Sequence, residues 1–281
     1  MSEILRKLVK GLRHEMASPI REIVGLLRDR KDYLSQPSNE FTRQGYEVIP
    51  DFWDKNECDR LIHLANRYLR DRSYIIDGNC YLVCREALQK VDTKVQQIMN
   101  CQEIDAGLSQ LFHSHIIEEM FEQRIGQKVR IRSITIQVDN LDTQTKRGFH
   151  NDGVTPPIYK AFIYLNDVED YGDGPYTVIP GSHCHTFRKI VNNFYNRIMI
   201  HMSADNTYLK GDMRLFYSDE QSVSIFGKAG TLILSIQQLA HKGWQQHDRN
   251  KRYVLSCYLI AEKYARDQPF TLGRKASLQE A

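Results

Sequence analysis

The hydrophobic positions of the first 125 residues recur mostly at helical spacing. The first such pattern consists of Ile4, Leu5, Leu8, Val9 and Leu12, with basic residues between them. A second helix is predicted from about 18 to 35, since Ser18 is suited to the N-cap and Pro19 to the first helical position. Further helices are predicted near 54–70, 87–100 and 105–124, with one short strand at 46–49. The N-terminal part is therefore expected to be mostly helical.

At Lys128 the spacing of hydrophobic and polar positions changes from the helical period to a period of two residues. Along 129–138, Ser133, Thr135 and Gln137 share one face, while Ile134 and Ile136 share the other. Further strands are predicted at 158–165, 176–179, 222–226, 231–236 and 252–260, interrupted by a single helix at 186–202. Strands that do not alternate with helices argue against a parallel Rossmann sheet. The sequence predicts an α+β fold with a double-stranded β-helix (jelly roll) core wrapped by N-terminal helices.

The chain is expected to divide into three parts. These are an N-terminal helical extension at 1–39, a jelly-roll domain at 40–262 and a C-terminal tail at 263–281. The pattern at 4–12 has no continuous apolar run and therefore predicts an amphipathic helix, not a signal peptide. Such a helix packs on the main domain or on a second subunit, so homo-oligomerisation through the N-terminal helices is one expectation; a helix lying on a membrane surface is the alternative.

Composition narrows the class of protein. The chain has 281 residues, 41% hydrophobic and 26% charged, and a net charge of +3, which is too small for a general attraction to nucleic acid. No apolar run approaches the roughly 18 to 20 residues of a membrane span. The six cysteines form no dense framework and are expected to be reduced thiols of a cytoplasmic protein. Cys80 and Cys84 are four apart, which is a weak zinc signal without a second pair.

One His-x-Asp triplet, His150-Asn151-Asp152, lies between two predicted strands. In an extended segment residues i and i+2 point to the same side, so both side chains can face a barrel interior. A facial metal triad needs two imidazoles and one carboxylate, with the opposite positions open for further ligands. His241 follows the apolar strand 231–236 and is placed to be the third ligand. Arg252 follows at the start of the last strand.

Three segments together resemble the phytanoyl-CoA dioxygenase-like group of Fe(II)/2-oxoglutarate-dependent oxygenases. They are F-H-N-D-G at 149–153, G-P-Y-T-V-I-P-G-S-H at 174–183, and A-H-K-G-W followed by N-K-R-Y-V at 250–254. The opening G-Y-E-V-I-P-D-F-W-D at 45–54 is also similar. The resemblance implies that His150, Asp152 and His241 bind Fe(II), that Arg252 holds the distal carboxylate of the cosubstrate 2-oxoglutarate, and that O2 is the oxidant.

One position departs from that group. The group often has a hydroxyl residue two positions after the distal histidine, where this chain has Gly243. The cosubstrate must then find different donors. Gln137 is one candidate near the proximal carboxylate, and it could equally face a polar core network; Lys160 and Tyr164 are weaker candidates.

The formal charges of this site cancel. Fe(II) and Arg252 balance Asp152 and the 2-oxoglutarate dianion, as a buried pocket requires. The expected reaction is hydroxylation of an unactivated C–H bond with release of succinate and CO2; desaturation and cyclisation stay open. Asp152 argues against halogenation, because related halogenases lack this carboxylate. A cupin-type metal enzyme without 2-oxoglutarate and a non-catalytic binding protein also stay open.

The sequence does not identify the substrate. Phe162, Tyr176, Arg188 and Trp244 are candidates for the substrate pocket, and the segment between His183 and His241 is longer than a minimal connection and predicts a lid. No CoA phosphate cradle is evident, so a small specialised metabolite is the favoured substrate.

Two histidine pairs outside the triad are expected to be structural. His113 and His115 fall in a helical stretch, where i and i+2 do not share a face. His183 and His185 belong to the P-G-S-H turn, which is structural in the group that the chain resembles.

Overall fold

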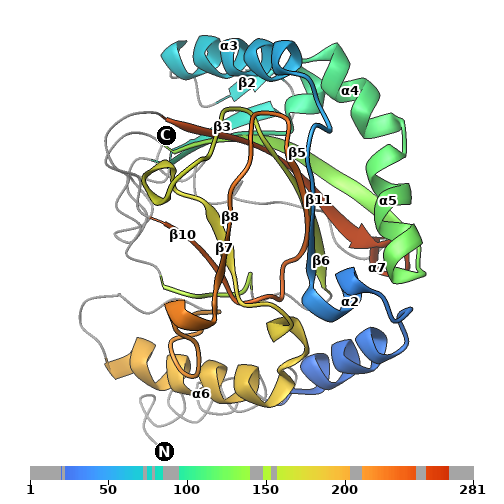
Figure 1. Ribbon diagram of the computed structural model, residues 1–281, viewed down its shortest axis with the longest axis vertical. Helices are drawn as coiled ribbons and strands as arrows, with labels where there is room; N and C mark the ends of the chain where they lie inside the picture. Colours follow the sequence, from blue (N-terminus) through green and yellow to red (C-terminus); the bar gives the residue numbers. More distant parts are fainter. Residues whose placement is uncertain are drawn as a thin grey trace, which may run out of the picture.

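The structure is a computed structural model that describes residues 20, 23–71, 75–77, 80–84, 95–139, 148–152, 157–202, 211–244 and 251–265. Figure 1 shows its two antiparallel sheets and the helices around them. The predicted helix at 4–12, the predicted N-cap at Ser18 and most of the predicted C-terminal tail lie outside the described residues. The division into an extension, a domain and a tail therefore stays a prediction.

The large sheet has eight strands, all paired antiparallel. Their order across the sheet is β1 (Tyr46–Ile49), β9 (Leu232–Ile236), β6 (Ile158–Tyr164), β11 (Arg252–Ala261), β5 (Val129–Asp139), β4 (Val95–Met99), β3 (Cys80–Cys84) and β2 (Ile75–Asp77). Five of the seven predicted strands are confirmed in this sheet, as β1, β5, β6, β9 and β11, and the two predicted at 176–179 and 222–226 are confirmed in the small sheet. β2, β3, β4 and β5 are consecutive strands, whereas the neighbours β5, β11, β6, β9 and β1 are not, because from β6 to β11 the chain crosses repeatedly between the two sheets.

The small sheet has the order β10 (His241–Gly243), β7 (Tyr176–Val178) and β8 (Val223–Ile225). His150 adds to it through an antiparallel bridge to His241. Their backbone groups exchange two hydrogen bonds, of 2.9 and 2.8 Å. The small sheet thus brings together two histidines from distant segments. Mixed helix and antiparallel sheet confirm the predicted class.

The two faces of the large sheet differ in chemistry because side chains alternate along each strand. The outer face carries apolar residues such as Ile134, Ile136, Leu255 and Leu259, which pack in one core cluster with residues of the covering helices. These helices are α3 (Lys55–Asp71), α4 (Ala106–His113) and α5 (Ile116–Ile125), which run along that side in Figure 1. The inner face is far more polar, and part of it packs with the small sheet.

The remaining helices are the helix at 23–34, α2 (Glu40–Gln44), α6 (Thr186–Met202) and α7 (Glu262–Ala265), with short 3-10 helices at Cys101–Glu103, Tyr171–Asp173, Ser182–Cys184 and Asp219–Gln221. The helix at 23–34 buries Leu26, Asp29 and Tyr33. Asp29 accepts a hydrogen bond of 2.8 Å from Gln238, in the turn between β9 and β10. This sequence-distant contact lies close to the start of β10.

Two predictions about the helical part need correction. The expected helix at 87–100 is wrong at its end, because Val95–Met99 forms β4. Val95, Ile98 and Met99 have spacings that fit a helix, so periodicity could not separate the two states over so few residues. The expected helix at 105–124 is two helices, separated at His115, which has a φ of 59°.

No helix among the described residues has the length and apolar character needed to cross a membrane. Five of the cysteines are described as free thiols: Cys58, Cys80, Cys101, Cys184 and Cys257.

Candidate metal centre

His150 and His241 face each other across the edge of the small sheet. Their ring centroids are 4.4 Å apart. Each ring is held by its Nδ1, which lies 3.1 Å from the Gly148 carbonyl oxygen in His150 and 2.9 Å from the Leu239 carbonyl oxygen in His241. A carbonyl oxygen can only accept, so Nδ1 carries the hydrogen in both rings. In the neutral imidazole this makes Nε2 the nitrogen with a lone pair for a metal.

Asp152 completes the group from the strand-like segment that carries His150. Its backbone N–H donates to the Gln237 carbonyl oxygen at 3.1 Å, which ties the segment to the turn before β10. One carboxylate oxygen, Oδ1, lies 3.7 Å from Nε2 of His241. Burial raises the pKa of Asp152, but the neighbouring Lys160, His241 and His150 outweigh that effect and lower it well below its usual range. The carboxylate is therefore ionised, as a metal ligand must be.

These three side chains fit a divalent transition metal. One ligand atom of each lies within 4.8 Å of those of the two remaining residues, and no second group of this kind occurs in the part of the chain that the structure describes. Cis ligands at bond lengths of about 2.1 Å are about 3 Å apart, so modest side-chain rotations would close the site around an ion. Two imidazoles and one carboxylate leave the remaining positions open for exogenous ligands.

Lys160 reaches the same carboxylate from the inner face of β6. Its Nζ lies 2.7 Å from Asp152 Oδ2, the oxygen not directed at His241. The ammonium also lies 4.6 Å from the centroid of the Tyr258 ring and 5.6 Å from that of Phe162. From the sequence, Lys160 was only a weak candidate for binding the cosubstrate; in the structure its described partner is the predicted metal ligand.

Arg252 lies on the inner face of β11, directly opposite Asp139 of β5. Its Nε donates to Asp139 Oδ2 at 2.8 Å, and Nη2 donates to the same oxygen. The guanidinium also approaches β10, because a Cβ added to Gly243 would lie 3.6 Å from Nη2. Arg252 is thus brought to the strand that carries His241, two residues beyond that predicted ligand.

Gln137 belongs to the polar network beside Arg252. Its Nε2 donates to Asp139 Oδ1 at 2.8 Å, and its Oε1 accepts from Gln97 Nε2 at 2.8 Å. The network therefore crosses β4, β5 and β11. A contact between Gln137 and the cosubstrate stays a prediction. Tyr164 is less available, since its hydroxyl donates to the Ile225 carbonyl at 2.9 Å and accepts from the Tyr176 N–H.

The predicted substrate residues do not all come together. Phe162 and Tyr176 do, with ring centroids 4.8 Å apart and the Tyr176 ring 5.4 Å from that of His241. Arg188 instead lies over the rings of Phe216 and Tyr217. Trp244 donates to Ser224 Oγ at 3.1 Å and packs against Tyr171 and Lys242. Phe162 and Tyr176 form one wall beside His150, Asp152 and His241, which we call the metal group.

The two histidine pairs outside the metal group have partners in the structure, and His113 contacts the Phe112 ring edge-on. His115 pairs with Glu118, His185 with the Tyr217 hydroxyl, and His183 is buried with its Nε2 donating to the Thr42 carbonyl. Burial lowers the pKa of His183 to about 3, so it is neutral.

Asp139 was not predicted from the sequence as a site residue. A signal for it was present, because Asp139 is two residues beyond Gln137 and alternation places it on the same polar face. The predicted strand ended one residue too early to include it.

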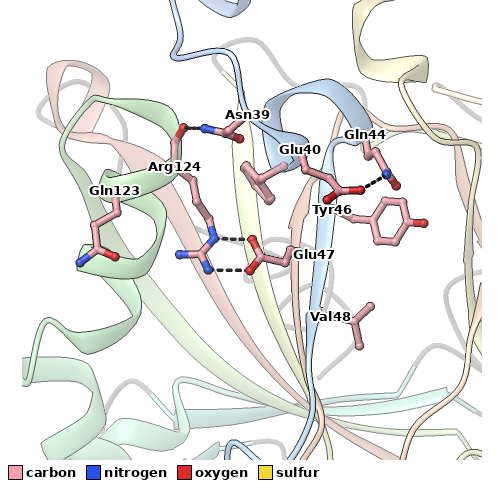
Figure 2. A pocket seen from close by; sticks show the side chains of 9 residues that line it. Asn39, Glu40, Gln44, Tyr46, Glu47, Val48, Gln123 and Arg124 are labelled. Atoms are coloured by element: carbon pink, nitrogen blue, oxygen red, sulfur yellow. Dashed lines mark hydrogen bonds and ion pairs between the residues drawn. The ribbon is translucent and has the colours of Figure 1, made fainter.

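A groove of about 530 Å³ lies elsewhere, at the edge of the large sheet (Figure 2). It is lined by α2, β1 and α5, and Arg124 and Glu47 form a two-bond ion pair within it. It contains none of the predicted ligands, so it is a separate surface feature.

No protein-family model matches the chain, and no curated protein sequence matches it. Solved structures do. The carbocyclase SnoK from nogalamycin biosynthesis, described as non-heme and α-ketoglutarate dependent, is 16% identical, covers 86% of this chain and 88% of its own, and has a TM-score of 0.58. HygX from Streptomyces hygroscopicus, with nickel, 2-oxoglutarate and hygromycin B bound, is 13% identical over 79% of this chain and 85% of its own, with a TM-score of 0.55. EctD from S. alaskensis, with bound Fe, is 18% identical over 79% and 74%, with a TM-score of 0.55. These neighbours either hold a bound metal or are described as α-ketoglutarate dependent, and the similarity shows that this chain shares their fold.

Proposed function

We propose that the protein is an Fe(II)/2-oxoglutarate-dependent oxygenase that oxidises a small molecule. The observation that carries the proposal is the convergence of His150, Asp152 and His241 within 4.8 Å, from segments about 90 residues apart, with Arg252 beside Gly243 on the strand of the third ligand. The structural neighbours that bind iron or nickel and 2-oxoglutarate support the choice of metal and cosubstrate.

Each residue has a distinct task. His150, Asp152 and His241 would hold an Fe(II) ion, whose chemistry when bound would be dioxygen activation coupled to the oxidative decarboxylation of 2-oxoglutarate to succinate and CO2. Arg252 would pair with the distal carboxylate of the cosubstrate, and the missing side chain at Gly243 leaves its guanidinium accessible from β10. Phe162 and Tyr176 exclude water from one side of the site.

The charge balance supports the arrangement. Lys160 and Asp139 were not part of the balance drawn from the sequence, and their charges have opposite sign. Each pairs with a residue that was included, Lys160 with Asp152 and Asp139 with Arg252. With Fe(II) and the 2-oxoglutarate dianion, the site remains neutral, which a largely buried site requires.

Hydroxylation of an unactivated C–H bond is the outcome that we propose, within the phytanoyl-CoA dioxygenase-like group and on a specialised metabolite. Desaturation and cyclisation are the alternatives, since the same fold is found in a carbocyclase and in SnoN, described as an epimerase. Asp152 fills the coordination position that halogenases leave for chloride, which disfavours halogenation. A cytoplasmic location and the lack of a nucleic-acid partner remain predictions from the sequence.

The test begins with binding, which needs no knowledge of the substrate. Purified protein under nitrogen is titrated with Fe(II) and then with 2-oxoglutarate, by calorimetry and by the visible absorption that Fe(II) gives when 2-oxoglutarate chelates it. We expect both to bind, His241→Ala to lose the metal, and Arg252→Met to lose the cosubstrate by two to three orders of magnitude. Metal binding without 2-oxoglutarate binding would indicate a cupin-type enzyme, and binding of neither would indicate a non-catalytic protein.

Turnover is tested next. Protein, Fe(II), ascorbate and 2-oxoglutarate are incubated in air with a small-metabolite extract, and succinate is measured by mass spectrometry. Succinate release should increase with the extract and disappear in the His241→Ala control. No increase over that control with any extract contradicts the proposed oxygenase activity.

A further inference from the structure

The two carboxylate oxygens of Asp152 have different neighbours. Oδ1 faces His241 Nε2 at 3.7 Å, and Oδ2 lies 2.7 Å from the Lys160 ammonium. The same carboxylate therefore has one oxygen on the side of the metal group and one paired with a cation.

The sheet fixes the position of this ammonium. Lys160 is in the middle of the pairing between β6 and its two neighbours, opposite Tyr258 of β11 and Ser235 of β9. Its side chain is only 11% exposed, and the ammonium lies near the faces of the Tyr258 and Phe162 rings. If the Lys160 ammonium moved away from Asp152, it would lose an ion pair and these cation–π contacts in a partly dehydrated site.

The number of oxygens that Asp152 uses decides how many coordination positions remain. A carboxylate can bind a metal through one oxygen or through both, and the second mode occupies an additional position. An octahedral ion with two imidazoles and one carboxylate oxygen has three positions left, two for 2-oxoglutarate and one for dioxygen. If the Asp152 carboxylate bound through both oxygens, its second oxygen would occupy a position that 2-oxoglutarate or dioxygen needs.

On the basis of the proposed function, we propose that Lys160 is a positioning residue that restricts Asp152 to binding the metal through Oδ1 alone and so keeps the cosubstrate positions open. Packing does not require a cation there, because an uncharged chain of the same length would fill the space between Tyr258 and Phe162. A lysine so near a divalent ion also repels it. The presence of Lys160 is explained by its ion pair with Asp152 Oδ2, which keeps that oxygen away from the metal.

The test compares Lys160→Met with the wild-type protein, using Fe(II) alone and then 2-oxoglutarate, under nitrogen. Methionine keeps the length and packs well against aromatic rings, but it cannot hold Oδ2. Fe(II) affinity should be retained or increased, because the carboxylate keeps its charge, loses a competing cation and gains use of its second oxygen. The affinity of the Fe(II)-loaded variant for 2-oxoglutarate should fall at least tenfold, and the visible absorption should be lost. Lys160→Arg, which restores a cation for Oδ2, should recover cosubstrate binding.

Lys228→Met is the matched control. Lys228 also pairs with carboxylates, Asp167 and Glu169, but on the surface, where it is 65% exposed. It should leave both affinities unchanged. The proposal is overturned if Lys160→Met binds 2-oxoglutarate as the wild type does, or if it loses Fe(II) as well.

A second measurement does not depend on whether the variant folds. A crystal structure of the wild-type protein with Ni(II) and 2-oxoglutarate should show one Asp152 oxygen on the metal and the second on Lys160; two oxygens on the metal would refute the proposal. If the wild-type protein binds Fe(II) but not 2-oxoglutarate, the proposed function has failed, and that result is distinct from either outcome for Lys160.

Discussion

The pairing of Arg252 with Asp139 leads to the most informative prediction, for Asp139→Asn. The Asp139 side chain is 4% exposed and that of Arg252 is 12% exposed, and both of these Arg252 hydrogen bonds go to one Asp139 oxygen. Asparagine keeps the shape but removes the negative charge, so the guanidinium is left buried without a counter-ion. Breaking a buried pair from one side costs about 3 to 5 kcal/mol.

This cost can be read as a melting temperature. For a chain of this length, 1 kcal/mol corresponds to about 2 °C, so Asp139→Asn should lower the melting temperature by about 6 to 10 °C in calorimetry. The double variant Asp139→Asn, Arg252→Met should recover part of the loss, since it removes the unpaired charge. Asp167→Asn, which removes a surface partner of Lys228, should change the melting temperature by less than about 2 °C.

The cosubstrate provides the second half of the test. If Arg252 receives a carboxylate of 2-oxoglutarate, the ligand supplies the negative charge that Asp139→Asn lacks. The rise in melting temperature on adding metal and 2-oxoglutarate should then be larger in the variant than in the wild type. A melting temperature within about 2 °C of the wild type without ligand would show that Asp139 does not neutralise Arg252, and the reasoning would be wrong.

Three further predictions concern the metal and a buried lysine. Asp152→Ala should abolish Fe(II) binding in calorimetry together with turnover; an unchanged affinity would remove Asp152 from the ligand set. Fe(II) at about 100 times its dissociation constant should stabilise the wild type by about 2.7 kcal/mol, or roughly 5 °C, and a chelator should reverse this; an equal response in His241→Ala would contradict the site. Burial lowers the pKa of Lys189, which is 1% exposed, to about 7 from its ordinary 10.5. Between these values the unfolded chain binds the extra proton, so stability rises with pH and the gain is lost as the pH falls towards 7. From about pH 7.5 to 9.5, urea unfolding should show a rise about 2 kcal/mol larger in the wild type than in Lys189→Met; equal slopes would indicate that Lys189 is not titrating.

Much of the fold could be predicted because its strands alternate strongly. Ile134 and Ile136 against Thr135 and Gln137 define two faces of β5, and the structure packs the first on the helices and turns the second towards the interior. The helix at 186–202 was predicted with the bounds that it has. Short elements were predicted unevenly: β7 and β8, of three residues each, were predicted, whereas β10, of three residues, and β4, of five, were not. So few residues do not distinguish one period from the other.

Some residues of the candidate site could be predicted from the sequence and others could not. His150 and Asp152 share a side because they are two residues apart in an extended segment, and that is local information. His241 and Arg252 were identified through resemblance to a family and through their places next to strands. The Asp139–Arg252 and Lys160–Asp152 ion pairs were not predicted, because each joins residues of different segments, which no local pattern specifies.

Alternation is a property of consecutive residues in one strand, so the side chains that face the interior can be identified from the amino-acid order. Which of these interior side chains contact one another depends on how the strands pair in the folded protein. The bridge between His150 and His241 joins two of the predicted ligands, and the register of β11 against β5 and β6 sets Arg252 opposite Asp139 and Tyr258 opposite Lys160. Register arises from contacts between segments far apart in the chain, where a shift of one residue would turn every side chain to the opposite face.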